Sequence, residues 1–326
     1  MTPAPTNTQS LQSEPEMQRG IYVPVLTFFN KDAEESLDLN TYYKHVQHMA
    51  KSGCAGIVAL GSTGERVSLS ERERDQLIKT ARKALDEAGF NKMPLIVGAG
   101  DHSVQGAIAS IKSSYQAGAT HALVLPSSYY PAQLGKQGII DFYTKVSIAS
   151  PIPIFIYSYP GVCSGIVIDS ETVTKLSSLP NICGIKHTDH DIGKMSRHCA
   201  LAAKGQKSFI VLGGASDYLI AALSVGAIGT ITGMANIVPK TVVRIQNLWD
   251  KGEYEEARSL QHILSLAEWE LGKGGIPIHK ELTEYVRGYG GKARSPVQPS
   301  SKEVIQQAIT GFAQLIELER KLEKVT

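Results

Sequence analysis

The 326-residue sequence has only four cysteines, no long apolar run and no excess of charge of one sign. The cysteines lie far apart without a CxxC pair, which argues against a zinc site or a disulfide frame and for reduced thiols. No apolar stretch approaches the roughly 20 residues that a membrane helix needs. Lys and Arg total 33 against 31 for Asp and Glu, so neither a nucleic acid nor an anionic membrane is expected as partner.

Residues 1–19 also lack material for a core, because they are rich in Pro, Ser, Thr and Glu. This composition predicts a disordered tail. A secretory signal would need a basic start and an apolar stretch, and a mitochondrial transit peptide would be rich in Arg and poor in acidic residues. Here Glu14 and Glu16 precede the first arginine, Arg19. The sequence therefore predicts a cytoplasmic protein.

From residue 20 onward, short apolar runs alternate with amphipathic stretches such as Leu39–Ser52, Ser70–Ala88 and Ser103–Ala117. Nearly continuous apolar runs are typical of parallel strands that are covered on both faces. The eight predicted strands are Tyr22–Phe28, Gly56–Leu60, Leu95–Val97, Ala122–Leu125, Ile154–Tyr157, Ile182–Lys186, Phe209–Leu212 and Ala227–Ile231. Glycines suited to end the helices follow several of the stretches, at Gly53, Gly89, Gly118, Gly205 and Gly226.

Alternating strands and helices imply a parallel sheet with right-handed crossovers. Eight such units in about 210 residues fit a closed (β/α)8 barrel, which we place at residues 20–235. The alternative is an open doubly wound sheet, which usually has a Gly-rich phosphate loop after its first strand, and Phe28–Asp32 is no such loop. Residues 236–326 are predicted to form a C-terminal helical region with helices over Val238–Lys251, Glu253–Leu271, Pro277–Tyr289 and Lys302–Leu322.

Active sites of such barrels lie at the carboxyl ends of the strands and in the loops that follow. After the second strand, Gly61 and Gly64 flank Ser62 and Thr63, with Glu65 next. Backbone N–H groups and hydroxyls could converge there on one anion, such as a carboxylate or a phosphate. The alternative is an ordinary turn in which the two hydroxyls are local caps.

The sixth predicted strand ends in Lys186. A lysine at the end of a buried strand is partly withdrawn from water, which favours the neutral amine that a Schiff base requires. The alternative is a lysine that reaches the rim or pairs with Asp189 or Asp191. The fifth strand ends in Tyr157, which could shuttle protons or could simply pack in the barrel.

A cluster of metal-ligand residue types, His187, Asp189, His190 and Asp191, follows Lys186. Strand alternation would point His187 away from the lysine's side and Thr188 back toward it. Asp191 is a natural cap for the next helix. A metal site needs three or four convergent ligands, so we predict no metal here. On the first helix, His45 and His48 are predicted to face solvent.

Taken together, these segments resemble the signatures of the dihydrodipicolinate synthase / N-acetylneuraminate lyase family. The matching segments are Gly61–Glu65, Tyr129–Tyr130, Tyr157–Pro160 and Gly184–Lys186. They occur in the family's order and spacing, and the similarity runs from residue 20 to residue 298. Each motif is weak by itself, but the four in order are a strong signal.

The resemblance implies a barrel with C-terminal helices, assembled as a homotetramer built from two dimers. It implies that Lys186 forms a Schiff base with pyruvate or a pyruvate-like 2-keto acid, so no separate cofactor is needed. It makes Tyr157 the proton shuttle, with Tyr130 entering a neighbouring subunit's site as a relay through Thr63.

The resemblance also implies a set of substrate contacts. Ser62 and Thr63 would bind the carboxylate of the keto acid, and Ile231 would face the site through its backbone carbonyl. Contacts to the distal part of the substrate would come from Thr188, Gly214, Ser216 and Asp217.

The sequence departs from the synthase branch between Pro160 and Gly165, where that branch usually has an arginine for a second carboxylate. Residues 159–162, 193–194 and 288–296 are more similar to the 2-keto-3-deoxy-L-galactonate aldolase branch. We therefore expect a lyase that cleaves a 2-keto-3-deoxy sugar acid to pyruvate and a hydroxyaldehyde, with the hydroxyls of Ser158, Thr188 and Ser216 available for a polyhydroxylated tail.

Four alternatives stay open. A 4-hydroxy-2-oxoglutarate aldolase would bind a second carboxylate, for which Lys194 and Arg197 are candidates. A dihydrodipicolinate synthase and a Schiff-base dehydratase of keto-deoxy acids would use the same lysine. The fourth alternative is a barrel that binds keto acids without turnover.

Overall fold

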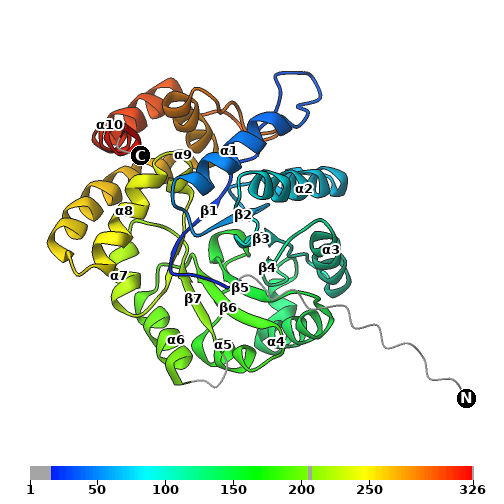
Figure 1. Ribbon diagram of the computed structural model, residues 1–326. Coiled ribbons are helices and arrows are strands. Elements are labelled where there is room, and N and C mark those ends of the chain that lie inside the picture. Colours follow the sequence, from blue (N-terminus) through cyan, green and yellow to red (C-terminus); the bar gives the residue numbers. More distant parts are fainter. Residues whose placement is uncertain (1–15, 205–207, 325–326) are drawn as a thin grey trace, which may run out of the picture.

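The computed structural model describes residues 16–204 and 208–324. Its eight strands are all parallel and close into a barrel in chain order, with helices around the outside (Figure 1). The predicted (β/α)8 barrel is thereby confirmed. The strands are β1 Gly20–Pro24, β2 Gly56–Ala59, β3 Leu95–Gly98, β4 His121–Val124, β5 Ile154–Ser158, β6 Ile182–His187, β7 Ile210–Gly213 and β8 Gly229–Ile231.

One helix follows each strand on the outside of the barrel (Figure 1). These helices are α1 Leu39–Lys51, α2 Glu71–Glu87, α3 Val104–Gln116, α4 Pro131–Ala149, α5 Ser170–Ser177, α6 Ile192–Lys204, α7 Leu219–Ser224 and α8 Pro239–Asp250. Short 3-10 turns precede three of them: η1 Arg66–Ser68, η2 Pro160–Val162 and η3 Gly233–Asn236. The helix α8 thus completes the strand–helix alternation, and the division of the chain at residue 235 stays a prediction.

The C-terminal region beyond α8 contains α9 Tyr254–Arg287 and α10 Lys302–Lys324. Gly275 interrupts α9 with a non-helical backbone (φ 58°, ψ −144°), and Pro277 stands just after the break. The two helices predicted over 253–271 and 277–289 are therefore the two halves of α9. The predicted N-terminal tail lies largely outside the described residues, as does Gly205.

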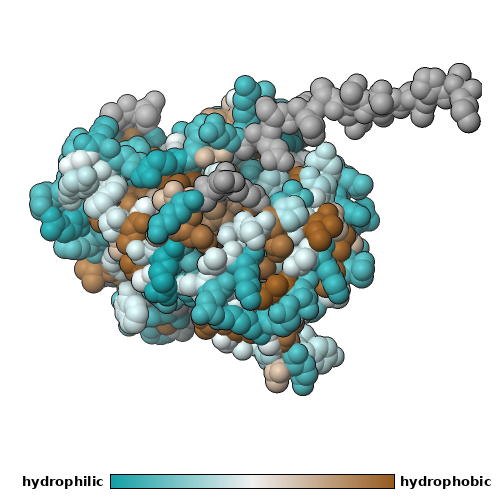
Figure 2. Space-filling model, turned by 90° about the horizontal axis from the view of Figure 1, so that it is seen from below, coloured by the Kyte–Doolittle hydropathy of each residue, from teal (hydrophilic) through white to brown (hydrophobic). Residues whose placement is uncertain are grey.

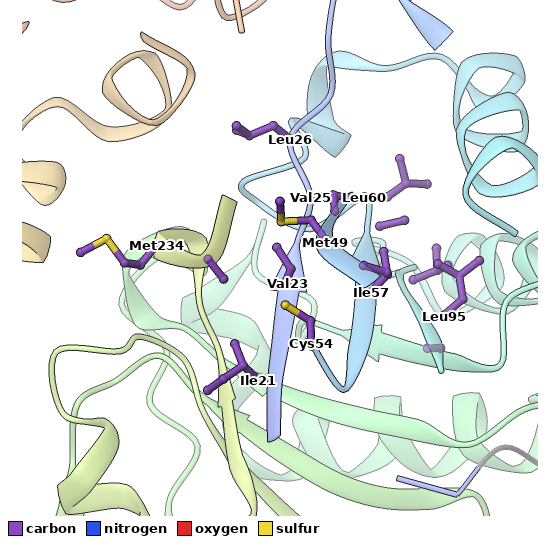
Figure 3. Close-up of a cluster of buried hydrophobic side chains, with 14 of the residues drawn as sticks. Ile21, Val23, Val25, Leu26, Met49, Cys54, Ile57, Leu60, Leu95 and Met234 are labelled. Atoms are coloured by element: carbon purple, nitrogen blue, oxygen red, sulfur yellow. The ribbon is translucent and has the colours of Figure 1, made fainter. Parts of the chain in front are cut away.

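The hydrophobic core has two layers, set by the alternation of side chains along each strand. Tyr22, Phe155 and Leu212 belong to a cluster inside the barrel. Ile21 and Val23, on either side of Tyr22, belong to the larger cluster between strands and helices (Figure 3). The first strand was predicted to reach Phe28 but ends at Pro24. Val25–Phe28 are still buried although they lie beyond the strand, so their apolar character did not reveal where the strand ends.

Several helices begin or end at residues suited to that position. Ser70 and Glu73 form both hydrogen bonds of a capping box at the start of α2. The predicted terminal glycines Gly53, Gly89, Gly118 and Gly226 all have positive φ. On the face shown in Figure 2, hydrophilic and hydrophobic residues are interspersed. In the described part of the chain, no helix is both long and apolar enough to cross a membrane.

Candidate active site

Lys186 and Tyr157 are direct neighbours at the carboxyl ends of two paired strands. The register of β5 and β6 places Tyr157 opposite Lys186, and Nζ of the lysine donates a hydrogen bond of 3.0 Å to the phenolic oxygen. Both side chains are buried, with 5% and 4% of their residue surface exposed. Because a buried amine beside a phenol is equipped for nucleophilic attack with local proton transfer, this pair is the candidate chemical centre of the site.

The carboxylates that could have paired with Lys186 are engaged elsewhere. Asp189 lies 2.6 Å from Nζ of Lys194, and its other oxygen lies 3.0 Å from Nδ1 of His187. Asp191 accepts a hydrogen bond from the backbone N–H of Lys194, which confirms it as the cap of α6. The structure thus places the amine of Lys186 on Tyr157 and not on either aspartate.

His187 points away from the lysine's side, as strand alternation predicts. Its Nε2 lies 3.0 Å from Nδ1 of His198 on α6. Although burial alone would raise the pKa of Asp189, hydrogen bonds from His187, Lys194 and Ser158 hold that pKa well below its usual range. In residues 16–204 and 208–324, no group of three or more His, Cys, Asp or Glu side chains is arranged to hold a metal ion.

The loop after β2, Gly61–Glu65, which we term the β2 loop, has a special backbone. Leu60 and Glu65 at its two ends both have positive φ, of 56° and 54°. The carbonyl oxygen of Leu60 lies so close to Gly98 that a Cβ there would be 2.0 Å away, so only glycine fits at that position. Residues with a left-handed backbone can orient neighbouring backbone N–H groups toward the same concave edge of a loop, where an anion can bind.

Within the β2 loop, the two predicted carboxylate-binding side chains remain accessible. Ser62 is exposed and Thr63 is half-buried. Among the described residues, the hydroxyl of Thr63 has no hydrogen-bond partner, so it is free to meet a ligand. Glu65 is held by the C-terminal region: its carboxylate accepts 2.8 Å hydrogen bonds from Nζ of Lys280 and from the backbone N–H of Arg294. The sequence motif contained Glu65 but gave no sign of these partners.

The loop after β7, Gly214–Asp217, which we term the β7 loop, meets Thr188. A Cβ at Gly214 would lie 2.1 Å from Oγ1 of Thr188, so a side chain is excluded there. Oγ1 of Thr188 is buried and has no hydrogen-bond partner in the described part of the chain. Since a buried hydroxyl without a partner is costly, it is a natural contact for a bound ligand.

Glu268 of α9 is a residue of this region that sequence reasoning missed. Its carboxylate accepts hydrogen bonds from both the backbone N–H and the hydroxyl of Ser216, at 3.0 and 2.6 Å. The hydroxyl of Ser216 is therefore already engaged, as is that of Ser158, which donates to Asp189. The sequence does contain a signal for its burial: Glu268 lies four residues after Leu264 and therefore on the same, apolar face of α9.

Two carboxyl groups thus gather at the β7 loop. Burial, together with the nearby charge of Asp217, raises the pKa of Glu268 to about 7. Burial also raises the pKa of Asp217, and His190 at 3.9 Å partly offsets this effect. One oxygen of Asp217 is buried without a hydrogen-bond partner among the described residues. These groups can accept hydrogen bonds from a ligand.

Other predicted residues lie as follows. Ile231 ends β8 inside the barrel and is fully buried. Tyr129 and Tyr130 pack edge-to-face before α4, and each is 68% exposed. Arg197 donates to Ser170 on the surface.

The prediction for the first helix was wrong at His45, which is fully buried. The reason is that residues far away in the sequence cover this face of α1: Asn236 and Tyr289 lie 2.9 and 3.1 Å from its two ring nitrogens. His48 is half-buried.

Comparisons with known proteins agree with this geometry. The dihydrodipicolinate synthetase family model matches residues 17–314. The chain is 37% identical to the L-threo-3-deoxy-hexylosonate aldolase of Aspergillus niger over 330 residues, covering 95% of this chain and 98% of the relative. It is 41% identical to a protein named probable 4-hydroxy-2-oxoglutarate aldolase, mitochondrial, of Emericella nidulans, covering 93% of this chain and 97% of the relative.

Solved structures show the same fold over nearly the whole chain. A dihydrodipicolinate synthase family protein from Coccidioides immitis has a TM-score of 0.83 at 34% identity, covering 94% of this chain and 98% of that chain. A dihydrodipicolinate synthase variant described as monomeric also has a TM-score of 0.83, at 25% identity, covering 91% of this chain and 97% of that chain. The chain therefore belongs to the dihydrodipicolinate synthetase family and is a class I aldolase of that family.

Proposed function

We propose that the enzyme cleaves a 2-keto-3-deoxy sugar acid to pyruvate and a hydroxyaldehyde through a Schiff base on Lys186. The observation that carries the choice of substrate is the pair of carboxyl groups, Asp217 and Glu268, at the β7 loop. The Lys186–Tyr157 pair supports the chemistry, and no separate cofactor is required.

In the proposed reaction, the neutral amine of Lys186 adds to the C2 carbonyl of the keto acid, and water leaves as the iminium forms. Tyr157, as the phenolate left after it gives its proton to the departing water, removes the proton of the C4 hydroxyl, and the C3–C4 bond breaks to release the aldehyde. The electron pair of that bond passes into an enamine, with the iminium nitrogen as its sink. Protonation at C3 and hydrolysis then release pyruvate and restore the free amine.

The β2 loop is suited to hold the substrate's carboxylate. The exposed Ser62 and the unpartnered hydroxyl of Thr63 would donate to it, which fixes the ketone next to Lys186. We assign the backbone carbonyl of Ile231 to the same part of the site because this residue ends β8 inside the barrel.

The distal part of the site favours hydroxyl groups over a second negative charge. Carboxylates accept hydrogen bonds from hydroxyls but repel another carboxylate, and this repulsion is strong where water is excluded. The hydroxyl of Thr188 supplies a further contact. Of the two cations considered for a second carboxylate, Lys194 pairs with Asp189, and Nε of Arg197 donates to Ser170 on the surface. The missing side chain of Gly214 leaves room for the hydroxyl of Thr188 itself.

The test is kcat/KM for 2-keto-3-deoxygalactonate, 2-keto-3-deoxygluconate and 4-hydroxy-2-oxoglutarate, measured beside the condensation of pyruvate with aspartate semialdehyde. We expect a deoxyhexonate to lead by roughly 30-fold or more, the size of one charge-assisted contact. A lead for aspartate semialdehyde would instead support the synthase. Release of pyruvate distinguishes the aldolase from a dehydratase, and any turnover excludes a protein that only binds keto acids.

A 4-hydroxy-2-oxoglutarate aldolase is the second candidate, and one specific observation favours it. The pKa of about 7 for Glu268 means that this carboxyl is largely protonated below neutral pH, where it could donate to a second carboxylate. If this reading holds, activity on 4-hydroxy-2-oxoglutarate rises relative to the deoxyhexonates as the pH falls from 8 to 6.

We further propose a homotetramer in the cytoplasm. The exposed Tyr130 would enter a neighbouring subunit's active site and act there as a relay through Thr63. One of the similar structures is of a variant described as monomeric, so the oligomeric state of this chain has to be measured. Light scattering of wild type and Tyr130→Ala gives the mass, and import into isolated mitochondria tests the location against the name of the Emericella nidulans relative.

A further inference from the structure

The carboxyl ends of β5 and β6 carry two consecutive cross-strand pairs of residues. Tyr157 lies opposite Lys186, and Ser158 lies opposite His187. Because successive side chains of a strand point to opposite faces, the first pair faces the barrel interior and the second faces the surrounding helices. Tyr157 accordingly belongs to the cluster inside the barrel. On the outer face, Ser158 and His187 are fully buried.

The carboxylate of Asp189 bridges this outer pair. Its Oδ2 accepts a hydrogen bond of 2.6 Å from the hydroxyl of Ser158, and its Oδ1 lies 3.0 Å from Nδ1 of His187. The pKa of Asp189, well below its usual range, keeps the carboxyl ionised, and an ionised carboxylate only accepts hydrogen bonds. Nδ1 of His187 is therefore the donor. One side chain thus holds both the residue that follows Tyr157 and the residue that follows Lys186.

Two residues of α6, Lys194 and His198, complete the network from the helix side. Nζ of Lys194 lies 2.6 Å from Oδ2 of Asp189, and only 5% and 4% of these two side chains are exposed. Nε2 of His187 lies 3.0 Å from Nδ1 of His198, so the His187 ring is held at both nitrogens. Charge-assisted hydrogen bonds are shorter and stronger than neutral ones. The network therefore keeps the Asp189 carboxylate in one position.

Resting on the proposed function, in which Lys186 and Tyr157 carry the chemistry, we propose that Asp189 is a positioning residue of the aldolase site. The last backbone hydrogen bond between the two segments, from Thr188 to Ser158, helps to set which residues pair. The carboxylate limits how far the two strand ends can move apart, so that Nζ of Lys186 and the phenolic oxygen of Tyr157 keep their separation of 3.0 Å. Because small displacements of reacting groups cost large factors in rate, losing this link lowers kcat.

The first experiment removes one arm of the bridge with Ser158→Ala, which leaves the ion pair of Asp189 in place. We expect kcat to fall about tenfold, less than the roughly hundredfold that a displacement of about 1 Å can cost. KM should change less than about threefold, because the β2 loop still binds the substrate's carboxylate. The matched control is Ser147→Ala on α4, a buried serine whose hydroxyl donates to the backbone carbonyl of Thr144, and it should match wild type. An unchanged kcat in Ser158→Ala would overturn the proposal.

The second experiment is a double-mutant cycle of Ser158→Ala with Tyr157→Phe. If the bridge acts by holding the phenolic oxygen beside Lys186, adding Ser158→Ala to Tyr157→Phe changes kcat less than about twofold, because that oxygen is already absent. A loosened fold would instead lower kcat by the same factor in both backgrounds. A full tenfold loss in the Tyr157→Phe background would therefore overturn the proposal.

The third experiment tests Asp189 itself by replacing the buried ion pair as a unit, with Asp189→Ala and Lys194→Met together. Neither charge is then left without its partner, and apolar replacement of a buried pair is often neutral for stability. We expect a thermal midpoint close to that of wild type and a kcat at least about tenfold lower. Adding Ser158→Ala should lower kcat less than about twofold further, because its acceptor is gone. A wild-type kcat, or losses that simply multiply, would overturn the proposal, and the two Ser158 experiments stand however well this variant folds.

Borohydride reduction with pyruvate separates this inference from the proposed function. A wild-type enzyme that forms no pyruvate adduct would refute the Schiff-base function itself. An adduct in Ser158→Ala together with an unchanged kcat would refute only the role of Asp189.

Discussion

Nζ of Lys280 lies 2.8 Å from Oε1 of Glu65, so a buried ion pair joins the β2 loop to a helix 215 residues away in the sequence. Both ends of this pair are shielded from water, and neither charge can be removed without stranding the other. The contact explains how a C-terminal region outside the barrel takes part in the geometry of the site.

Replacing Glu65 with Gln should lower the free energy of unfolding by about 3–5 kcal/mol, because it leaves the ammonium of Lys280 buried without a counter-charge. Urea unfolding followed by circular dichroism measures the change. The matched control is Asp75→Asn, which breaks an exposed pair with Lys79 and should cost less than about 1 kcal/mol. Equal effects of the two substitutions would show that burial of the Glu65 pair is without consequence.

Replacing Tyr157 with Phe should lower kcat by roughly two to four orders of magnitude, the usual range for a general acid–base group. The fold should survive, since the aromatic ring remains in the barrel interior, and the pyruvate adduct should still form in part. Steady-state kinetics and adduct mass provide the measurement. A kcat equal to that of wild type would assign Tyr157 to packing alone.

Glu268 gives a pH-dependent prediction. Its pKa rises from 4.5 in the unfolded chain to about 7 in the folded protein, so the folded state binds the extra proton between these values. The contribution of Glu268 to stability is then lost as the pH rises from 4.5 through 7. The free energy of unfolding of Glu268→Gln minus that of wild type should therefore rise by on the order of 1–3 kcal/mol from pH 5 to pH 8. If this difference in unfolding free energy stayed constant across the range, burial would not shift the pKa of the Glu268 carboxyl.

Exhaustive chelation should leave activity intact, because the predicted chemistry proceeds on Lys186 and the side chains of His187 and Asp189 are engaged with each other and with His198 and Lys194. The assay compares dialysed enzyme with and without a strong chelator. Recovery of a lost activity by zinc or manganese would point to a metal-dependent aldolase instead.

Local patterns in the sequence were sufficient to predict the barrel, and the resemblance to a family singled out Lys186 and Tyr157. Each strand is a short apolar run, and Lys186 and Tyr157 end adjacent strands in a parallel order, which places them side by side. The family model that matches residues 17–314 confirms the family that the signatures around these residues predicted.

The sequence was less informative where distant segments meet. His45 was predicted to face solvent, but Asn236 and Tyr289 cover it in the structure. The partners of Glu65 and Ser216 include Lys280 and Glu268, which lie on α9. Such contacts depend on how the C-terminal helices pack against the barrel, which no local periodicity encodes. For the same reason, the hydroxyl of Ser158 was expected to be free but donates to Asp189.

The most direct test of the central claim is reduction with sodium borohydride in the presence of pyruvate, followed by peptide mass spectrometry. Lys186 lies buried beside Tyr157, and a Schiff base there would be trapped as a stable secondary amine. We predict loss of activity with one reduced pyruvate unit per chain, located on Lys186 and absent from Lys186→Arg. An adduct on another lysine, or none with full activity retained, would contradict the account.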